Sequence, residues 1–193
     1  MAKRKDIDRG ELVALGTGLL RTVGYRGFSF RDLAERAGIR AASVHHHFPT
    51  KGHLLSAIVA AHREALNRDM ALVAAETDDF GGRLRRVIDW FRTDDGDGAM
   101  APMAMALAAE AGDFPAPALE EWRLLEANRS GWIGRFYAEA RTRGSVPREV
   151  EPATAGAAWF AALQGILALT RGRGADLRPA LLAHLAGWAR PVE

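Results

Sequence analysis

Apolar residues recur at intervals of three and four from one end of this sequence to the other, and almost nowhere do they alternate with polar residues. Intervals of three and four place side chains on one face of an α-helix, whereas a half-buried strand requires a period of two. Clusters of Gly, Pro and Asp interrupt the pattern and mark helix ends. The pattern therefore predicts an all-α fold of about nine helices for the 193 residues.

Local end signals divide the N-terminal part of the chain into four helices. Gly24 and Gly38 are placed to end helices, Ser29 to cap one, and Pro49 with Thr50 to open a long one. The expected helices cover about 8–23, 30–37, roughly 41–47 and about 51–76. The first is expected to bury the stripe Leu12, Leu15, Leu19 and Val23.

Turn residues mark five further helices beyond this part of the chain. Their apolar stripes contain, in chain order, Leu84, Val87, Ile88 and Phe91; Met100, Met103 and Leu107; Trp122, Leu125, Trp132, Ile133, Phe136 and Ala140; Trp159, Leu163, Ile166, Leu167 and Thr170; and Leu181, Leu182, Leu185 and Trp188. Residues 153–170 contain no charge, but Ala and Gly dominate them and Gln164 interrupts them. We expect a buried helix there and no membrane span.

Composition limits the class of protein. The sequence contains no cysteine, which excludes a disulfide framework, a thiolate zinc site and a cysteine nucleophile. Residues 1–10 are charged throughout and contain no apolar run, so neither a signal peptide nor a lipid anchor is expected. A cytoplasmic location is the default expectation.

The two short helices, joined by a glycine-containing turn and preceded by a longer helix, have the proportions of a DNA-binding helix-turn-helix. They lie in the basic part of the chain, because residues 1–51 carry a net charge of +5 and the remainder −3. Apolar residues expected to pack this unit are Leu33, Ala34, Ala37, Ile39 and Val44. Residues expected nearer the surface are Arg40, Ala41, Ser43, His46 and His47. The alternative is a small helical subdomain with a solvated basic face.

A longer pattern over about forty residues resembles the tetracycline-repressor (TetR) family of bacterial transcription regulators. The residues that carry it are Gly24-Tyr25, Ser29, Leu33-Ala34-Glu35-Arg36-Ala37-Gly38-Ile39 and Val44-His45-His46-His47-Phe48-Pro49-Thr50-Lys51-Gly52-His53-Leu54. The sequence departs from the family pattern at three of its positions. The usual polar cap is absent at Arg40, the usual tyrosine is His45, and Gly52 replaces the common glutamate.

The resemblance implies that residues 41–47 form the recognition helix, that Ser29 and Arg31 approach the DNA backbone, and that Lys51 contacts a phosphate. A lysine at a helix N-terminus also adds its charge to free backbone amides and to the positive end of the helix dipole, which favours an anion. Arg40 can reach a guanine edge or a phosphate. The expected DNA contacts are Ser29, Arg31, Arg40, Ala41, Ser43, His45, His46, His47 and Lys51.

Other motifs give no sign of catalysis or metal binding. Three adjacent histidines on a helix point about 100 degrees apart, so residues 45–47 cannot converge on one ion. The acidic stretch at 93–98 lacks the ligand spacing of a calcium loop and is interpreted as a turn. Neither a catalytic serine elbow nor a nucleotide-binding loop is present. We therefore expect a protein that is not an enzyme and that needs no cofactor or metal.

The C-terminal region is rich in methionine and aromatic side chains, most of which a hydrophobic core explains. The family resemblance implies that some of them line a cavity for an inducer. The pocket candidates are His62, Met70, Met103, Trp122, Asn128, Trp132, Tyr137, Trp159 and Gln164. Helices near 153–171 and 177–188 are expected to pair in a homodimer, the first through exposed small residues at Ala155, Ala158, Ala162 and Gly165.

These expectations combine into a homodimeric transcriptional regulator, a repressor of palindromic operator DNA that a small-molecule effector releases. Residues 1–50 would form the DNA-binding domain, and residues 51–193 the ligand-binding and dimerisation domain. One alternative is a constitutive DNA-binding protein of the same fold with a filled core. Another is a helical enzyme or lipid-binding protein whose N-terminal pattern is incidental.

Overall fold

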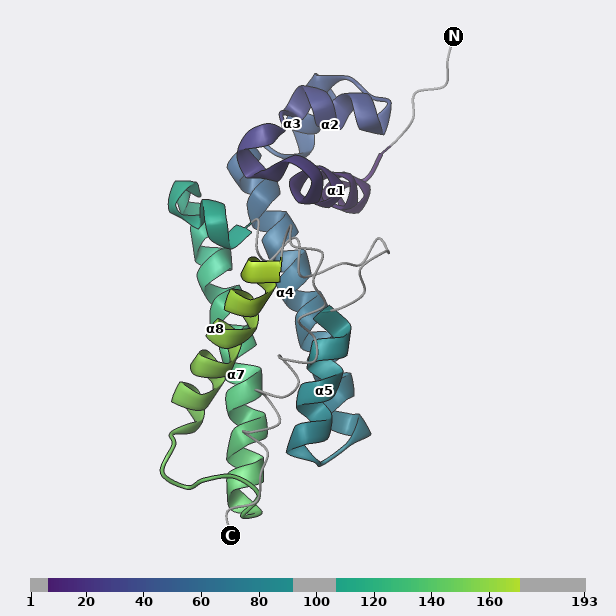
Figure 1. The fold of residues 1–193 in the computed structure, drawn as a ribbon. Helices are drawn as coiled ribbons and strands as arrows, with labels where there is room; N and C mark the ends of the chain where they lie inside the picture. The colour runs from purple at the N-terminus through teal and green to yellow at the C-terminus, as the bar shows by residue number, and fades with distance from the viewer. Residues whose placement is uncertain (1–6, 92–106, 171–193) are drawn as a thin grey trace. The chain divides into compact units, whose positions relative to one another are not determined.

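The computed structural model describes residues 7–91 and 107–170, and within these ranges all regular structure is helical (Figure 1). The elements are α1 (Arg9–Gly27), α2 (Phe30–Ala37), α3 (Ala41–His47), α4 (Lys51–Glu76), α5 (Phe80–Phe91), the 3-10 turn η1 (Ala111–Asp113), α7 (Ala116–Thr142) and α8 (Pro152–Thr170). None of the helices in these ranges is long and apolar enough to cross a membrane.

The helix ends agree with the sequence signals from α2 to α4, whereas α1, expected to end at residue 23, continues across a break at Gly24 to Gly27. The bounds of α2, α3 and α4 coincide with the expected ranges, and Ser29 and Gly38 flank α2 as predicted. The all-α prediction is thus confirmed for this part of the chain. The expected stripes at Met100 and Met103 and at residues 181–188 lie outside the described residues.

Contacts divide the chain into two compact units. The first unit comprises Met1–Arg63 and Pro102–Leu125, and the second comprises Glu64–Ala101 and Glu126–Glu193. The divisions fall inside α4 and α7, so each of these helices contributes to both units. The functional boundary expected after residue 50 stays a prediction.

In the first unit, α1 begins at a capping box. The Asp8 carboxylate accepts from the Glu11 backbone N–H at 2.7 Å, while the Glu11 carboxylate accepts from the Asp8 N–H at 3.1 Å. The buried face of α1 consists of Leu12, Gly16, Leu19 and Leu20. A Cβ on Gly16 would lie 3.0 Å from the Ile58 side chain, so α1 packs closely on α4 there. Val23, which directly precedes the non-helical Gly24, is 48% exposed, so its expected place on the buried stripe is wrong.

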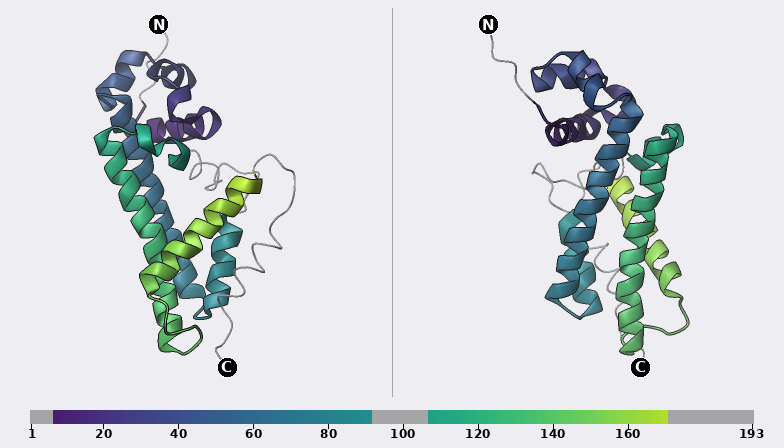
Figure 2. Two further views of the ribbon diagram at one scale, coloured as in Figure 1. Left: turned by 60° about the vertical axis from the view of Figure 1, so that its left-hand side comes forward. Right: turned by 180° about the vertical axis from the view of Figure 1, so that it is seen from behind.

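In the second unit, α8 crosses α7 near the beginning of α8 (Figure 2). A Cβ on Gly134 would lie 2.8 Å from the Pro152 carbonyl oxygen, and one on Gly156 would overlap the Ser130 carbonyl oxygen. Ala155, beside this crossing, is 1% exposed. The expectation that Ala155 lies on an exposed face is therefore wrong, because the first turns of α8 serve the packing on α7.

Candidate nucleic-acid interface

The start of α2 is fixed by Ser29, one of the expected backbone contacts. Its Oγ accepts from the Asp32 N–H at 3.3 Å and donates to the Asp32 carboxylate at 2.7 Å, and its own N–H donates to that carboxylate at 2.6 Å. The side-chain hydrogen bond from Ser29, followed by the backbone one, lowers the pKa of Asp32. Ser29 thus begins α2, and its hydroxyl is already engaged within the capping box.

The turn between α2 and α3 sets the direction in which α3 leaves. Gly38 adopts a left-handed conformation with φ 69°, its N–H donates to Glu35 O, and the Ile39 N–H donates to Ala34 O at 3.0 Å. This is the Schellman arrangement, which favours glycine because other residues are strained at positive φ. The buried residues of the two helices are Leu33, Ala34, Ala37 and Val44. These side chains pack between the two helices, which lie next to each other in Figure 1.

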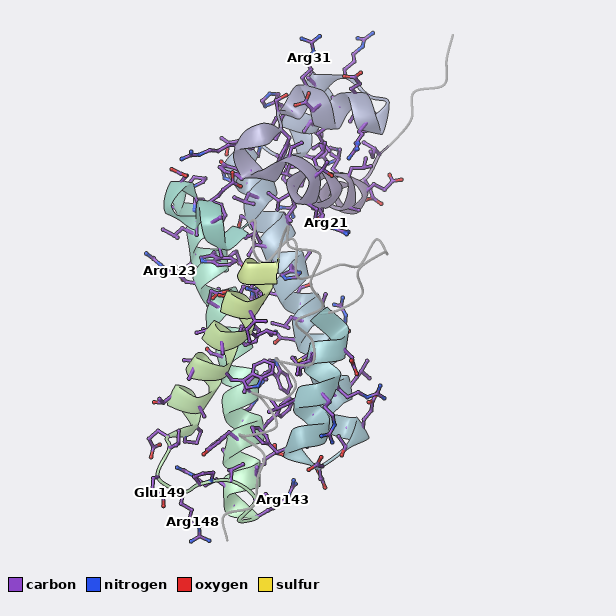
Figure 3. All side chains as sticks on the ribbon, viewed as in Figure 1. Arg21, Arg31, Arg123, Arg143, Arg148 and Glu149 are labelled. Carbon is purple, nitrogen blue, oxygen red and sulfur yellow. The ribbon has the colours of Figure 1, made fainter. Side chains whose placement is uncertain are left out.

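The outer surface of α3 carries the residues expected to contact DNA. Arg40, Ala41, His45 and His46 are exposed, and Ser43 and His47 are partly buried. Arg40 occupies the N-cap position without making a side-chain cap, so its guanidinium is not engaged in starting the helix. On α2, the labelled Arg31 side chain extends away from the helices into solvent (Figure 3).

The imidazole at the usual tyrosine position packs on a neighbouring helix. The His45 ring lies edge-on to the Phe30 ring of α2, with the ring centroids 4.8 Å apart. The adjacent His46 and His47 rings are 5.6 Å apart at 75° to each other. Within the described ranges, no cluster of three histidine, aspartate or glutamate side chains is arranged to hold a metal ion.

Lys51, the first residue of α4, lies in a recess between two aromatic rings. Its Nζ is 4.6 Å from the centroid of Tyr25 and 4.5 Å from that of Phe28. An ammonium at such distances is attracted by the electron-rich ring faces, by about 0.5–2 kcal/mol per contact in general. Burial lowers the pKa of Lys51, and the nearby carboxylates of Glu110 and Asp32 oppose that shift. The sequence pattern predicts the position of Lys51, but it does not predict its contacts with these two rings.

The expected pocket residues are distributed over both units. His62 and Trp122 are buried in the first unit, and Met103 lies outside the described residues. In the second unit the buried ones are Met70, Tyr137 and Trp159, and the partly buried ones are Asn128, Trp132 and Gln164.

Several polar groups of this set already have partners within the protein. Asn67, which sequence reasoning missed, accepts with its Oδ1 from Trp132 Nε1 at 2.8 Å and from Asn128 Nδ2 at 3.2 Å. The Tyr137 hydroxyl donates to Pro147 O at 2.8 Å. By contrast, Trp159 Nε1 and Gln164 Nε2 are buried and have no hydrogen-bond partner among the residues that the structure describes.

Comparison with known proteins gives a family match over the N-terminal part of the chain. Residues 12–58 match the family model described as bacterial regulatory proteins, tetR family. The HTH-type transcriptional regulator CymR of Pseudomonas putida is 43% identical over 56 residues. That match covers 29% of this chain and 28% of the relative's own length. The matched residues include the capped start of α2, the Gly38 turn, α3 and Lys51.

Solved structures share the fold over almost the whole chain. The reduced form of NemR from E. coli has a TM-score of 0.83 at 17% identity and covers 95% of this chain and 97% of its own. A TetR-family transcriptional regulator from Agrobacterium tumefaciens has a TM-score of 0.79 at 23% identity, with coverage of 94% and 93%. At these identities the likeness establishes the helical fold.

Proposed function

Since the chain belongs to the TetR family of bacterial regulatory proteins, we propose that it binds operator DNA as a homodimer and releases it when a small molecule binds. In this proposal α3 enters the major groove as the recognition helix. Arg40 reads base edges, and Lys51 contacts a phosphate. Regulation is then repression, with the small molecule as inducer.

The main support for DNA binding is the composition of the α3 surface. The helix contains no acidic residue, it exposes Arg40 and two imidazoles, and its first residues are alanines that leave room beside a groove. A solvated basic face would also expose cations. The match of residues 12–58 to a family of regulators favours DNA as what this face binds.

Two buried donors in the second unit support an effector over a constitutive regulator with a filled core. A buried donor without a partner costs about 1–3 kcal/mol of stability in general. Trp159 is fully buried, and both its indole N–H and the Gln164 amide lack such a partner. An effector with carbonyl, carboxyl or hydroxyl oxygens would satisfy these donors. A filled, constitutive core would leave both donors unsatisfied.

The homodimer is supported by small residues on the outer side of α8. Ala158 and Gly165 are exposed there, and Ala162 is partly buried. Small side chains allow a helix from a second copy to approach closely. A two-fold dimer also matches a palindromic operator, whose half-sites lie on one face of the DNA. Sedimentation showing a stable monomer at micromolar concentration would contradict this part of the proposal.

Fluorescence anisotropy with DNA from upstream of the protein's own gene, and with a random duplex of equal length, tests the function. We expect preference for the upstream DNA and an affinity that falls at least about a hundredfold between roughly 50 and 200 mM salt, because phosphate contacts release counterions. Absence of salt-dependent binding to either duplex would favour a helical enzyme or lipid-binding protein. Native mass spectrometry of protein from its own host tests for a retained effector. Trp159→Phe, which removes the indole donor, should weaken retention.

A further inference from the structure

A carboxylate from a distant segment holds the end of α1. Gly24 interrupts α1 with φ 74°, which leaves the backbone N–H groups after it without helical partners. The Glu110 Oε2 accepts from the Tyr25 N–H at 2.6 Å, and Oε1 accepts from the Arg26 N–H at 3.2 Å. A Cβ on Gly24 would lie 2.9 Å from this carboxylate. Glu110 therefore acts as the N-cap of the last turn of α1.

Three further contacts join the segment that carries Glu110 to the end of α1 and to the start of α4. Arg26 forms an ion pair with Asp113, and the Tyr25 ring lies edge-on to the Phe114 ring at 5.6 Å. A Cβ on Gly52, where the family pattern has glutamate, would overlap the Pro115 ring. Glycine at position 52 is therefore what allows this approach to the start of α4. All these residues belong to the first unit.

Tyr25 connects this fastening to the cation expected to contact DNA. Its backbone N–H is bound by Glu110, while the face of its ring contacts the Lys51 ammonium. Phe28, which is 3% exposed, supplies the second ring and is fixed by the core. A free lysine side chain has many rotamers, and holding its head between two rings removes most of that freedom before any phosphate arrives.

We propose that Glu110 is a positioning residue for DNA binding: by fixing Tyr25, it holds the Lys51 ammonium between the Tyr25 and Phe28 rings, at the point from which Lys51 contacts a phosphate. The inference rests on the proposed function for the phosphate contact alone. The geometry of the Lys51 recess can be measured without DNA. The segment from residue 107 to 125 thereby influences the proposed phosphate contact of Lys51.

Lysine NMR tests the recess directly, because the sequence has lysines only at 3, 5 and 51. Reductive methylation with ¹³C-formaldehyde labels them, and the Lys51 signal is the one that Lys51→Arg removes. In the folded protein we expect this signal upfield of its position in urea, owing to the ring currents of Tyr25 and Phe28. Glu110→Ala should move it most of the way to the urea position, and Glu110→Gln, which keeps one acceptor, should move it less.

The matched control is Glu120→Ala, which removes an exposed carboxylate of the same unit. It should leave the Lys51 signal in place. If Glu110→Ala does not fold, Tyr25→Leu replaces it, since this variant keeps the N–H that Glu110 binds but removes one ring. An upfield Lys51 signal that survives both Glu110→Gln and Tyr25→Leu unchanged would overturn the proposal.

A double-mutant cycle on a random 30-bp duplex tests the effect on DNA binding. Glu110→Ala is expected to weaken binding about three- to tenfold in the wild type and to have no effect in a Lys51→Ala background, because it acts through that lysine. Equal effects in both backgrounds would overturn the positioning role. If the wild type binds no DNA, the proposed function fails, and the NMR result still decides whether Glu110 holds Lys51.

Discussion

Among the described residues, the first unit exposes arginines at expected DNA-contact positions, whereas the second unit also buries two arginines. Arg31 and Arg40 in the first unit are exposed, and Figure 3 shows Arg31 extending into solvent. Arg83 and Arg129 in the second unit are 3% and 2% exposed. Arg31 and Arg40 are thus displayed to solvent, whereas Arg83 and Arg129 are used inside the second unit. Charge alone therefore does not identify a binding surface; its exposure and its partners do.

Arg83 shows what an internal arginine does. Its guanidinium donates to the Thr77 and Ala74 carbonyl oxygens at 2.6 and 3.1 Å and to the Glu139 carboxylate at 2.5 Å, and it lies 4.8 Å from the centroid of Phe136. These contacts join the end of α4, the start of α5 and the later part of α7. The hydrogen bonds of the Arg83 guanidinium therefore stabilise the fold of the second unit.

The largest expected effect is on this internal arginine. Arg83→Ala should lower the free energy of unfolding by about 3 kcal/mol, since it removes a buried guanidinium and leaves the Thr77 and Ala74 carbonyl oxygens and the Glu139 carboxylate without their donor. Urea denaturation followed by circular dichroism measures it. The control Arg85→Ala removes an exposed ion pair with Asp79 and should cost less than about 0.5 kcal/mol. Similar losses in both variants would break the comparison.

The next largest effect is expected at the interruption of α1. Gly24→Ala should cost about 2 kcal/mol, because alanine is strained at positive φ and its Cβ would meet the Glu110 carboxylate. The control is Gly112→Ala, whose Cβ would have no heavy atom within 4 Å. Thermal unfolding of both variants measures the difference. If Gly24→Ala leaves the stability unchanged, the end of α1 can change its conformation to accept alanine without cost.

Substitutions of the exposed or partly exposed cations Lys51 and Arg40 should change the affinity for DNA and have little effect on the free energy of unfolding. Lys51→Ala should weaken binding to all duplexes about tenfold and reduce the salt slope by about 1, whereas Arg40→Ala should mainly reduce preference among operator variants. Anisotropy titrations over several duplexes and salt concentrations separate the two. Uniform weakening by Arg40→Ala would show that Arg40 contacts phosphate instead of a base.

The smallest effect is expected at Ser29. Ser29→Ala removes a helix cap and should cost about 1 kcal/mol, while Ser145→Ala, at an exposed turn position, should cost almost nothing. In the wild type, a carboxylate whose pKa is lowered stabilises the fold above its unfolded pKa, and this stabilisation is lost as the pH falls through the folded pKa. The variant should therefore raise the pKa of Asp32 and lessen the loss of stability below about pH 4. An NMR titration of the carboxyl groups measures the pKa of Asp32, and urea denaturation at several pH values measures the loss of stability.

Local signals predicted the helices well and their faces less well. Ser29, Gly38 and Pro49 act within a few residues of their own positions, so the bounds of α2, α3 and α4 could be predicted. The faces expected for Val23 and Ala155 are wrong, because Val23 lies beside the break at Gly24 and Ala155 lies beside the close contact of Gly156 with α7. Such contacts depend on a partner helix that helical periodicity does not reveal.

The residues that complete the candidate sites could not be predicted for the same reason. Asn67 and Glu110 are ordinary surface residue types, and their partners lie 61 to 85 positions away. Lys51 could be located from the family pattern, but its recess depends on the conformation of Tyr25, which Glu110 fixes.

The cap on the last turn of α1 also has a consequence for synthesis on the ribosome. Tyr25 and the carboxylate that binds its N–H are separated by 85 positions. At translation rates of about 5–20 residues per second, that separation amounts to roughly 4–17 s. During this interval α2 and α3, which carry the proposed DNA contacts, are synthesised, but the end of α1 has no cap. The nascent chain therefore acquires its DNA-binding surface in two steps, and a chain truncated before residue 110 completes only the first.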